Sequence, residues 1–558
     1  MAAGGLEAEL IDVLAVFIVA GAVGAFVAKY ARIPYTIALL VAGFVASLAG
    51  VELGIELTHD VILLVLLPPL LFEGAATTDL EAFRADLPVI LLLSVVGLLF
   101  STVVVGVAVN AMLGFPLLVA LLFASMVLPT DPVSVLALFE EIGAPDRLSV
   151  LVEGESLLND GVGVVVFTTL LALVESGASP ETLTDPVQLA GVGADIAIAS
   201  LGGAVVGLAA GYAVYRVMVS LDEHMTEIVL TIVLAYGAFL LAEHYLHVSG
   251  VIATVVAGLF MGNRGREYAM SPQTKVSVFS AWDTGAFIVN TFIFLVIGVQ
   301  TPLRQILEVG HLLAPAIAVV LVGRAVSIYP LVGLSNRFRP DGIPLSTQHV
   351  LVWSGLHASI PIALALGLPP GFPFRQELRV MTFGIAAFSL VVQGLTIRRL
   401  VDFLGIATVS EEERLYQLLV GRARAVDEVL EAAESLRKQN RISESVYERF
   451  SAEYTAEKED LNEAISRLLA EHPPLRDRER LTGERQLLIR EEAAIRDAEH
   501  AGLVTSDVAA DLLDEVNLKL DRVRRGETTV TRERDVEGYE EYWRQRAREH
   551  GLLDESPR

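Results

Sequence analysis

Apolar runs of roughly 20 residues, the length at which a helix crosses a hydrocarbon core of about 30 Å, recur along the first 405 residues of this 558-residue chain. Inside a bilayer the backbone finds no outside hydrogen-bond partner, so each segment has to satisfy its own N–H and C=O groups as a helix. The sequence therefore predicts an all-α polytopic membrane protein.

About thirteen spans are predicted from these runs. Two of the spans, 249–262 and 284–299, are short for a crossing, so we expect them to be tilted or longer than these ranges. The first ten residues, MAAGGLEAEL, are acidic and do not resemble a cleaved signal peptide, so we expect the first run to be retained as a span. The predicted spans are 8–29, 34–50, 60–76, 87–112, 116–139, 148–173, 187–219, 225–246, 249–262, 284–299, 307–331, 347–368 and 378–401.

Basic residues between the spans fall mainly on one side, which predicts the orientation because cytoplasmic loops are enriched in Lys and Arg. The richer side holds Lys29, Arg32, Arg84, Arg147, Arg216, Arg264, Arg266, Lys275, Arg337, Arg339, Arg398 and Arg399. The other side holds Arg304, Arg375 and Arg379. We therefore expect the N-terminus outside and the C-terminal tail in the cytoplasm of a cell whose plasma membrane the chain crosses.

The hydropathy changes abruptly near Gly405, which predicts a membrane domain over 1–405 and a soluble domain over 406–558. The tail has 25 basic and 36 acidic residues, and its apolar positions recur three and four apart between charges. HPPL at 472–475 interrupts this pattern. We expect a solvated, acidic, helical cytosolic domain rather than a membrane-surface anchor.

The overall composition excludes several kinds of chemistry. The chain has no cysteine, which rules out disulfides, thiolate catalysis and cysteine-ligated zinc. Its net charge is −26 and only five residues are Lys, which argues against a nucleic-acid partner. A high-salt habitat and a GC-rich genome account equally well for this acidic, lysine-poor balance.

Several polar residues lie inside the sixth span, in the stretch EGESLLNDGVG at 153–163. An ionised group at bilayer depth costs about 3 kcal/mol or more, and such groups usually mark a pathway or a relay. Helical spacing places Ser156 and Asp160 on one face, and Glu155 and Asn159 on the neighbouring face. Oxygen ligands of this kind suit hard cations.

Two spans contain signals that break a helix. VLPTDPVSV in the fifth span places Pro129 and Pro132 around Thr130 and Asp131, and WSGLHASIPIAL in the twelfth span has a glycine and a proline around a polar patch. If spans 1–6 and 8–13 form two halves around span 7, both breaks fall in the fifth span of a half. Interrupted helices at matching positions predict two inverted six-helix repeats with a midplane site.

The remaining polar residues of the spans allow structural as well as functional interpretations. Asp131 can act as a structural hydrogen-bonding group, and Glu155 and Arg324 can simply neutralise each other. Glu73 fits a structural role, an access path or cation ligation. For His357 a packed, hydrogen-bonded histidine is favoured over a ligand.

Four motifs together resemble the electroneutral sodium–proton antiporters, the group that includes the prokaryotic NhaP-type antiporters and the animal sodium–proton exchangers. GESLLNDG resembles their sixth span, and LPTDPV resembles their unwound fifth span. HVSGVIATVVAGLFMGNRGR at 247–266 and VQGLTIRRLV at 392–401 resemble later segments of the prokaryotic members. The resemblance covers residues 10–405.

The resemblance implies a role for each polar residue. It makes Asp160 the carrier of a proton or a cation, with Asn159 beside it, and Glu155 and Arg324 a stabilising ion pair. It implies that Ser156, Thr130 and Asp131 supply cation-site oxygens and that Glu73 is an acid near the site. Animal members have Gly-Leu-Arg-Gly in the twelfth span, where this chain has Gly355-Leu356-His357-Ala358.

The resemblance implies a secondary active transporter, not an enzyme, that exchanges sodium, with lithium as a further cation, for protons. Asn rather than Asp at position 159 leaves one titrating group and favours one cation per proton. We expect alternating access in a homodimer embedded in lipid, with no cofactor besides the transported ions. Potassium is the alternative substrate. A cation channel is disfavoured because no filter-like repeat is present, and an intramembrane aspartyl protease because Asp160 precedes Gly161-Val162-Gly163 rather than following such a sequence.

Overall fold

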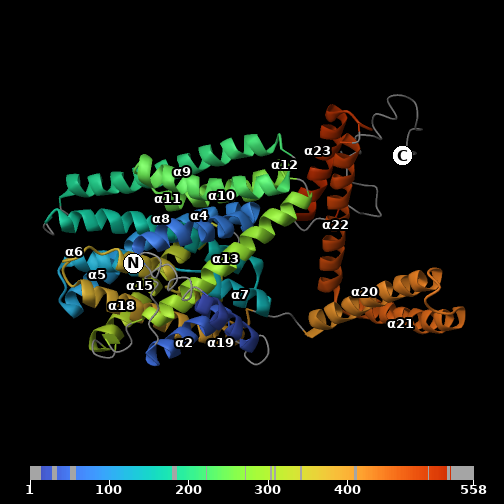
Figure 1. Cartoon of the computed structure of the whole chain (residues 1–558), viewed down its shortest axis with the longest axis horizontal. Coiled ribbons are helices and arrows are strands. Elements are labelled where there is room, and N and C mark those ends of the chain that lie inside the picture. Colours follow the sequence, from blue (N-terminus) through green and yellow to red (C-terminus); the bar gives the residue numbers. More distant parts are fainter. Residues whose placement is uncertain are drawn as a thin grey trace, which may run out of the picture. The chain divides into compact units, whose positions relative to one another are not determined.

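The chain divides into two compact units, Met1–Thr408 and Val409–Arg558. The computed structural model describes residues 14–27, 34–50, 58–178, 185–221, 223–270, 272–301, 305–306, 310–339, 342–406, 411–500, 502–524 and 528. Within these residues both units are built of helices, without a strand (Figure 1). The all-α prediction is confirmed.

Every predicted span overlaps a helix of the first unit. Among the described residues, seven helices are long and apolar enough to cross a membrane. Two of them are Asp146–Glu175 and Leu80–Leu113, the second of which runs on through a π-helical segment at Leu92–Gly97. The unit is therefore a multi-pass membrane domain. Its helices are Leu14–Val27, α2 (Tyr35–Leu48), α3 (Leu67–Thr77), α4 (Leu80–Leu91), α5 (Leu98–Leu113), α6 (Leu117–Val127), α7 (Val133–Ile142), α8 (Asp146–Glu175), α9 (Pro186–Met218), α10 (His224–Leu240), α11 (Gly250–Phe260), α12 (Arg266–Tyr268), α13 (Pro272–Gln300), α15 (Gly310–Asn336), α16 (Leu345–Trp353), α17 (Ser359–Leu366), α18 (Arg375–Phe388) and α19 (Gly394–Phe403).

Two predicted spans begin too late in the sequence. The range 284–299 is only the second half of α13, because the first half of that helix carries Lys275 and Asp283 and reads as polar. The fourth span begins at Leu80, where the Asp79 side chain accepts a hydrogen bond from the Glu81 N–H at 2.9 Å. Residues 8–13 of the first predicted span, with Lys29, Arg32 and Arg304, lie outside the described residues.

Both predicted interruptions are confirmed, and they lie against each other. The first separates α6, which ends at Val127, from α7, which begins at Val133, and it contains the two prolines that remove backbone donors. The second separates α16 from α17 over residues 354–358. The Asp131 N–H donates to the Leu356 carbonyl at 2.7 Å. A backbone hydrogen bond therefore joins the two interruptions inside the membrane domain.

Helix α11 packs closely against α3, α8 and α9, and in Figure 1 α8 to α11 run alongside one another. Small residues allow this approach, as is usual between membrane helices. A Cβ atom on Gly207 of α9 would collide with the Ala253 carbonyl of α11. A Cβ atom on Gly262, just after α11, would collide with the Ala76 carbonyl of α3. The contacts hold α3 and α8, which carry the acidic residues discussed below, close to α11.

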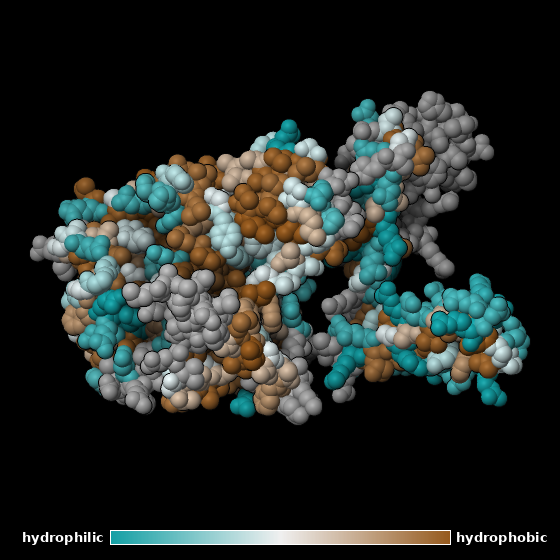
Figure 2. Space-filling view, in the orientation of Figure 1, coloured by the Kyte–Doolittle hydropathy of each residue, from teal (hydrophilic) through white to brown (hydrophobic). Residues whose placement is uncertain are grey.

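The outer surface of this unit is apolar over wide areas, coloured brown in Figure 2. Helix α9 shows this most clearly, because only 6% of its most apolar stretch is buried inside the protein. Its exposed side chains include Ile198, Leu201 and Val205. An apolar helix face of this extent is suited to contact with lipid tails.

In the described part of the second unit the helices are α20 (Glu411–Lys438), α21 (Glu444–Glu471), α22 (Pro473–His500) and α23 (Ser506–Arg524), and their surface is largely hydrophilic (Figure 2). The predicted break at 472–475 is present at His472, which separates α21 from α22, and Pro473 begins α22. A second break, not predicted, turns α20 into α21 at Asn440, whose φ is 54°. Hydrogen bonds from Arg437 hold the pKa of the Glu434 carboxyl at about 2, well below its usual range.

Candidate cation site

The middle of α8 carries four buried polar residues in six positions. Glu155, Ser156, Asn159 and Asp160 are each less than 10% exposed. The helix can approach its neighbours here because two glycines follow Asp160, and a Cβ atom on the second, Gly163, would collide with the Pro129 ring. Helix α8 therefore touches the first interruption directly, and Ser156 and Asn159 face its unwound backbone.

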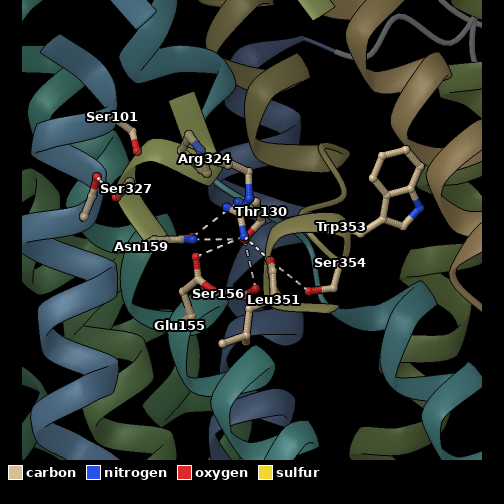
Figure 3. A network of polar contacts seen from close by, with 12 residues as sticks. Ser101, Thr130, Glu155, Ser156, Asn159, Arg324, Ser327, Leu351, Trp353 and Ser354 are labelled. Atoms are coloured by element: carbon tan, nitrogen blue, oxygen red, sulfur yellow. Dashed lines mark hydrogen bonds and ion pairs between the residues drawn. The ribbon is translucent and has the colours of Figure 1, made fainter. Parts of the chain in front are cut away.

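Thr130 is the centre of the polar contacts between α8 and the first interruption (Figure 3). Its N–H donates to Asn159 Oδ1 at 3.3 Å, and its Oγ1 accepts from Asn159 Nδ2 at 2.9 Å. Thr130 Oγ1 also lies 3.0 Å from Ser156 Oγ. The Asn159 amide is thus occupied on both sides by Thr130, and it fixes the unwound segment against α8.

Asp131 is held both by its backbone and by its side chain. Its backbone is bonded to Leu356, and its Oδ1 accepts from the Val133 N–H at 3.0 Å at the start of α7. A carboxylate suits this place because a helix N-terminus carries partial positive charge. The same side chain lines a large cavity beside the site.

This cavity, of about 470 Å³, lies among α3, α7, α8 and α13. Its wall includes six carboxylates, and the described residues that line it include no Lys, Arg or His. The six are Glu73, Asp131, Glu140, Glu153, Asp160 and Asp283. Six carboxylates without a basic group favour the entry of cations and exclude anions.

Glu155 and Arg324 lie on the other side of α8. Arg324 Nη2 is 3.2 Å from Glu155 Oε1 and donates to the Leu351 carbonyl at 2.9 Å (Figure 3). Both side chains are almost fully buried, and the cavity that they line has a volume of only about 20 Å³. A Cβ atom on Gly355 would collide with the guanidinium. The Glu155 carboxylate is therefore paired with Arg324 and does not line the large cavity, whereas Asp160 does.

The predicted site residues thus separate into three groups. Asp160, Asp131 and Glu73 line the large cavity. Ser156 and Asn159 both hydrogen-bond to Thr130 behind that wall. Glu155 and Arg324 form the pair on the far side.

Three acidic residues of the cavity wall, Glu140, Glu153 and Asp283, were not among the predicted site residues. Asp283 lies one residue before the predicted tenth span, and Glu140 one residue after the predicted fifth span. Their positions at span ends would have been a usable signal. Glu153, which also lines the cavity, accepts a hydrogen bond from Thr78 Oγ1 at 2.8 Å.

A second buried charge cluster was not predicted at all. Asp86 of α4 is 4% exposed, and its carboxylate accepts from Arg147 Nε at 2.8 Å and from Arg147 Nη2 at 2.9 Å. Arg339 Nη2 lies 2.9 Å from the same carboxylate. The sequence indicated only that these two arginines belong to one side of the membrane. They also fasten α4 to the start of α8 and to the segment after α15.

Two interrupted helices that meet beside a buried carboxylate, with an acidic cavity leading to it, define a secondary cation transporter rather than an enzyme. The comparisons with known proteins agree. Residues 14–403 match the family described as "Sodium/hydrogen exchanger, transmembrane", and the chain belongs to this family.

The similarity to individual members of the family covers most of the chain. The chain is 37% identical over 404 residues to the Na(+)/H(+) antiporter ApNhaP of Aphanothece halophytica, covering 72% of this chain and 75% of that protein. It is 32% identical over 511 residues to the Na(+)/H(+) antiporter NhaG of Bacillus atrophaeus, covering 88% and 94%. The sodium proton antiporter MjNhaP1 from Methanocaldococcus jannaschii has the same fold, with a TM-score of 0.57 at 18% identity, covering 72% of this chain and 98% of that one. The resemblance to this family is confirmed.

Proposed function

We propose that this protein exchanges sodium for protons by alternating access, with the cation and the proton competing for Asp160. The observation that carries the proposal is the position of Asp160, buried in the middle of α8 and lining an acidic cavity of about 470 Å³. A single buried carboxylate can hold a proton or a hard cation, but not both. The names of the two relatives support sodium as the cation.

The proposed stoichiometry is one sodium per proton. Asn159 is neutral and bonded to Thr130, and Glu155 is paired with Arg324, so neither is free to exchange a proton with the cavity. Asp160 then carries one positive charge in each direction, as a cation or as a proton. Lithium is included as a second cation, and Thr130, Ser156 and Asp131 would provide further oxygens close to Asp160.

The proposed setting is the plasma membrane, with the N-terminus outside and the tail in the cytoplasm. In this orientation Thr77, Glu140 and Ser149, which line the cavity, lie at the cytoplasmic ends of α3, α7 and α8, so the cavity opens inward. We also propose a homodimer whose apolar helix faces contact lipid. The scheme requires no cofactor besides the transported ions.

Cation-driven proton movement in proteoliposomes tests the substrate directly. Purified protein is reconstituted in vesicles that are acidic inside and contain no sodium, and uptake of labelled sodium, lithium or potassium is compared while internal pH is recorded. We expect sodium and lithium to be taken up and to move protons in the opposite direction. Uptake of potassium alone would identify a potassium–proton antiporter, and cation uptake without proton movement would reject antiport altogether.

Exchange is expected to be independent of membrane voltage, because no net charge crosses the membrane in a one-to-one cycle. If one elementary charge moved per cycle, the cycle would be coupled to about 2.3 kcal/mol per 100 mV. The measurement imposes a potassium–valinomycin potential on proteoliposomes at equal pH and equal sodium on both sides. Sodium flux driven by the potential alone would show that a second group titrates, with Glu73 and Asp131 as the candidates.

The tail is expected to be dispensable for turnover. All the carboxylates of the acidic cavity lie in the first unit, and the tail helices are hydrophilic. A chain that ends after Leu404 should keep its maximal exchange rate, with or without a shift in its pH midpoint. The check is a pH profile of exchange for the full and shortened chains, and a folded truncation without transport at any pH would contradict the expectation.

A further inference from the structure

His357 lies in the second interruption, is 1% exposed, and has no part in the proposed exchange of cation and proton. At this position of the twelfth span the animal sodium–proton exchangers, which the chain resembles, carry an arginine. The His357 ring contacts the first interruption, which is 228 residues away in the sequence. A buried polar side chain that connects the two unwound segments needs a physical explanation.

The explanation begins with the Pro129 carbonyl. In an uninterrupted helix this oxygen would accept from the Val133 N–H, four residues on. Here the Val133 N–H donates to Asp131 Oδ1 instead, so the carbonyl needs another donor within the membrane domain. His357 Nδ1 lies 3.1 Å from the Pro129 oxygen. A carbonyl oxygen can only accept, so Nδ1 carries the hydrogen and donates it.

The backbone of His357 is itself fixed by a hydrogen bond. Its backbone N–H donates to Ser389 Oγ at 3.0 Å, and Ser389 is fully buried between α18 and α19. Its ring Nε2 has no hydrogen-bond partner in the described part of the chain. The polar role of this side chain therefore rests on Nδ1 alone.

Two adjacent residues of the second interruption form hydrogen bonds with the first interruption, one on each side of Thr130. Leu356 accepts from the Asp131 N–H at 2.7 Å, and His357 donates to the Pro129 carbonyl. Thr130, between these two anchors, directs its Oγ1 to Asn159 and Ser156. The position of the Thr130 oxygens is therefore set by α8 on one side and by residues 356 and 357 on the other.

We propose that His357 is a positioning residue of the cation site, which fixes Thr130 and Asp131 by donating its Nδ1 hydrogen to the Pro129 carbonyl. The inference rests on the proposed function, because it assigns His357 a part in sodium affinity. Loss of this hydrogen bond lets the Pro129–Asp131 segment shift and displaces its oxygens. The sodium KM should then rise by about tenfold, the order expected for one buried acceptor left without its donor, while kcat changes little.

The test compares three substitutions of one residue in proteoliposomes, with KM and kcat for sodium and the melting temperature as readouts. His357→Asn keeps an amide nitrogen one bond from Cγ, where Nδ1 stands. His357→Gln moves the nitrogen one bond further out, and His357→Leu removes it. His349→Leu is the matched control, because His349 lies on α16 and contacts Tyr329 Oη at 2.6 Å, away from both interruptions.

We expect a raised KM in His357→Leu and His357→Gln, a KM near the wild-type value in His357→Asn, and an unchanged KM in the control. A folded His357→Leu protein with the wild-type KM overturns the proposal, and so does His357→Asn with a KM as high as that of His357→Gln. If His357→Leu does not fold, the comparison of Asn with Gln decides. A wild-type protein that exchanges no sodium would refute the proposed function instead, so the two failures are distinguishable.

Discussion

The Asp160→Asn protein is expected to fold and to exchange no sodium for protons above the rate of empty liposomes. Asparagine keeps the shape of the side chain but can neither take up a proton nor balance the charge of a cation. Asp160 is the residue of the α8 cluster that faces the large cavity, whereas Glu155 is sealed behind Arg324. The measurement is sodium-triggered proton release from purified protein, followed by labelled sodium uptake in proteoliposomes.

Asp146→Asn is the matched control for this experiment. Asp146 is the first residue of the same helix and is exposed, so the same chemical change there should leave exchange intact. Melting temperatures of both variants establish that each protein is folded. Sodium-triggered proton release from Asp160→Asn at the wild-type level would remove Asp160 from the mechanism.

Replacement of Arg324 by Ala is expected to reduce the stability of the membrane domain by about 3–5 kcal/mol, because it leaves the buried Glu155 carboxylate without its counterion. The substitution also removes the donor to the Leu351 carbonyl in α16. Sodium affinity should change less than stability, because Arg324 does not line the large cavity. Thermal melts and sodium KM values of the purified protein measure the two effects.

The double variant Glu155→Gln/Arg324→Ala makes this test sharper. With Glu155 neutral, no uncompensated charge remains, so the double variant should melt above Arg324→Ala alone. Arg337→Ala is the control, since Arg337 follows the same helix and is exposed. If Arg324→Ala melts like the wild type, the pair contributes nothing to stability.

The local features of this fold were predictable from the sequence, because each depends on neighbouring residues. Pro129 and Pro132 stand three residues apart and each removes a backbone donor, which predicts an interrupted helix from the local sequence. Residues four apart share a face of α8 in any surrounding. Apolar length located the spans, although it failed at the start of α13, where Lys275 and Asp283 lower the mean hydropathy of the helix.

The relations between distant segments were not predictable in the same way. Glu73 and Asp283 line one cavity although 209 positions separate them. Whether Asn159 faces the ion path or holds Thr130 depends on how α8 packs against α6, and helical spacing alone does not report that. No local pattern singles out Asp86, because the two arginines that contact it, Arg147 and Arg339, come from other segments. Such pairings follow from packing, which one sequence does not encode in any local pattern.

The wall of six carboxylates also determines how the protein should respond to ionic strength. Fixed negative charge accumulates mobile cations, so the sodium activity beside Asp160 should exceed that of the bulk solution in dilute buffer. Added salt screens this field over a Debye length of about 8 Å at 0.15 M ionic strength. The apparent affinity should therefore weaken as an inert electrolyte is added, although the ligands at Asp160 stay the same. This enrichment does not distinguish one monovalent cation from another, so discrimination among them has to arise at the oxygens around Asp160.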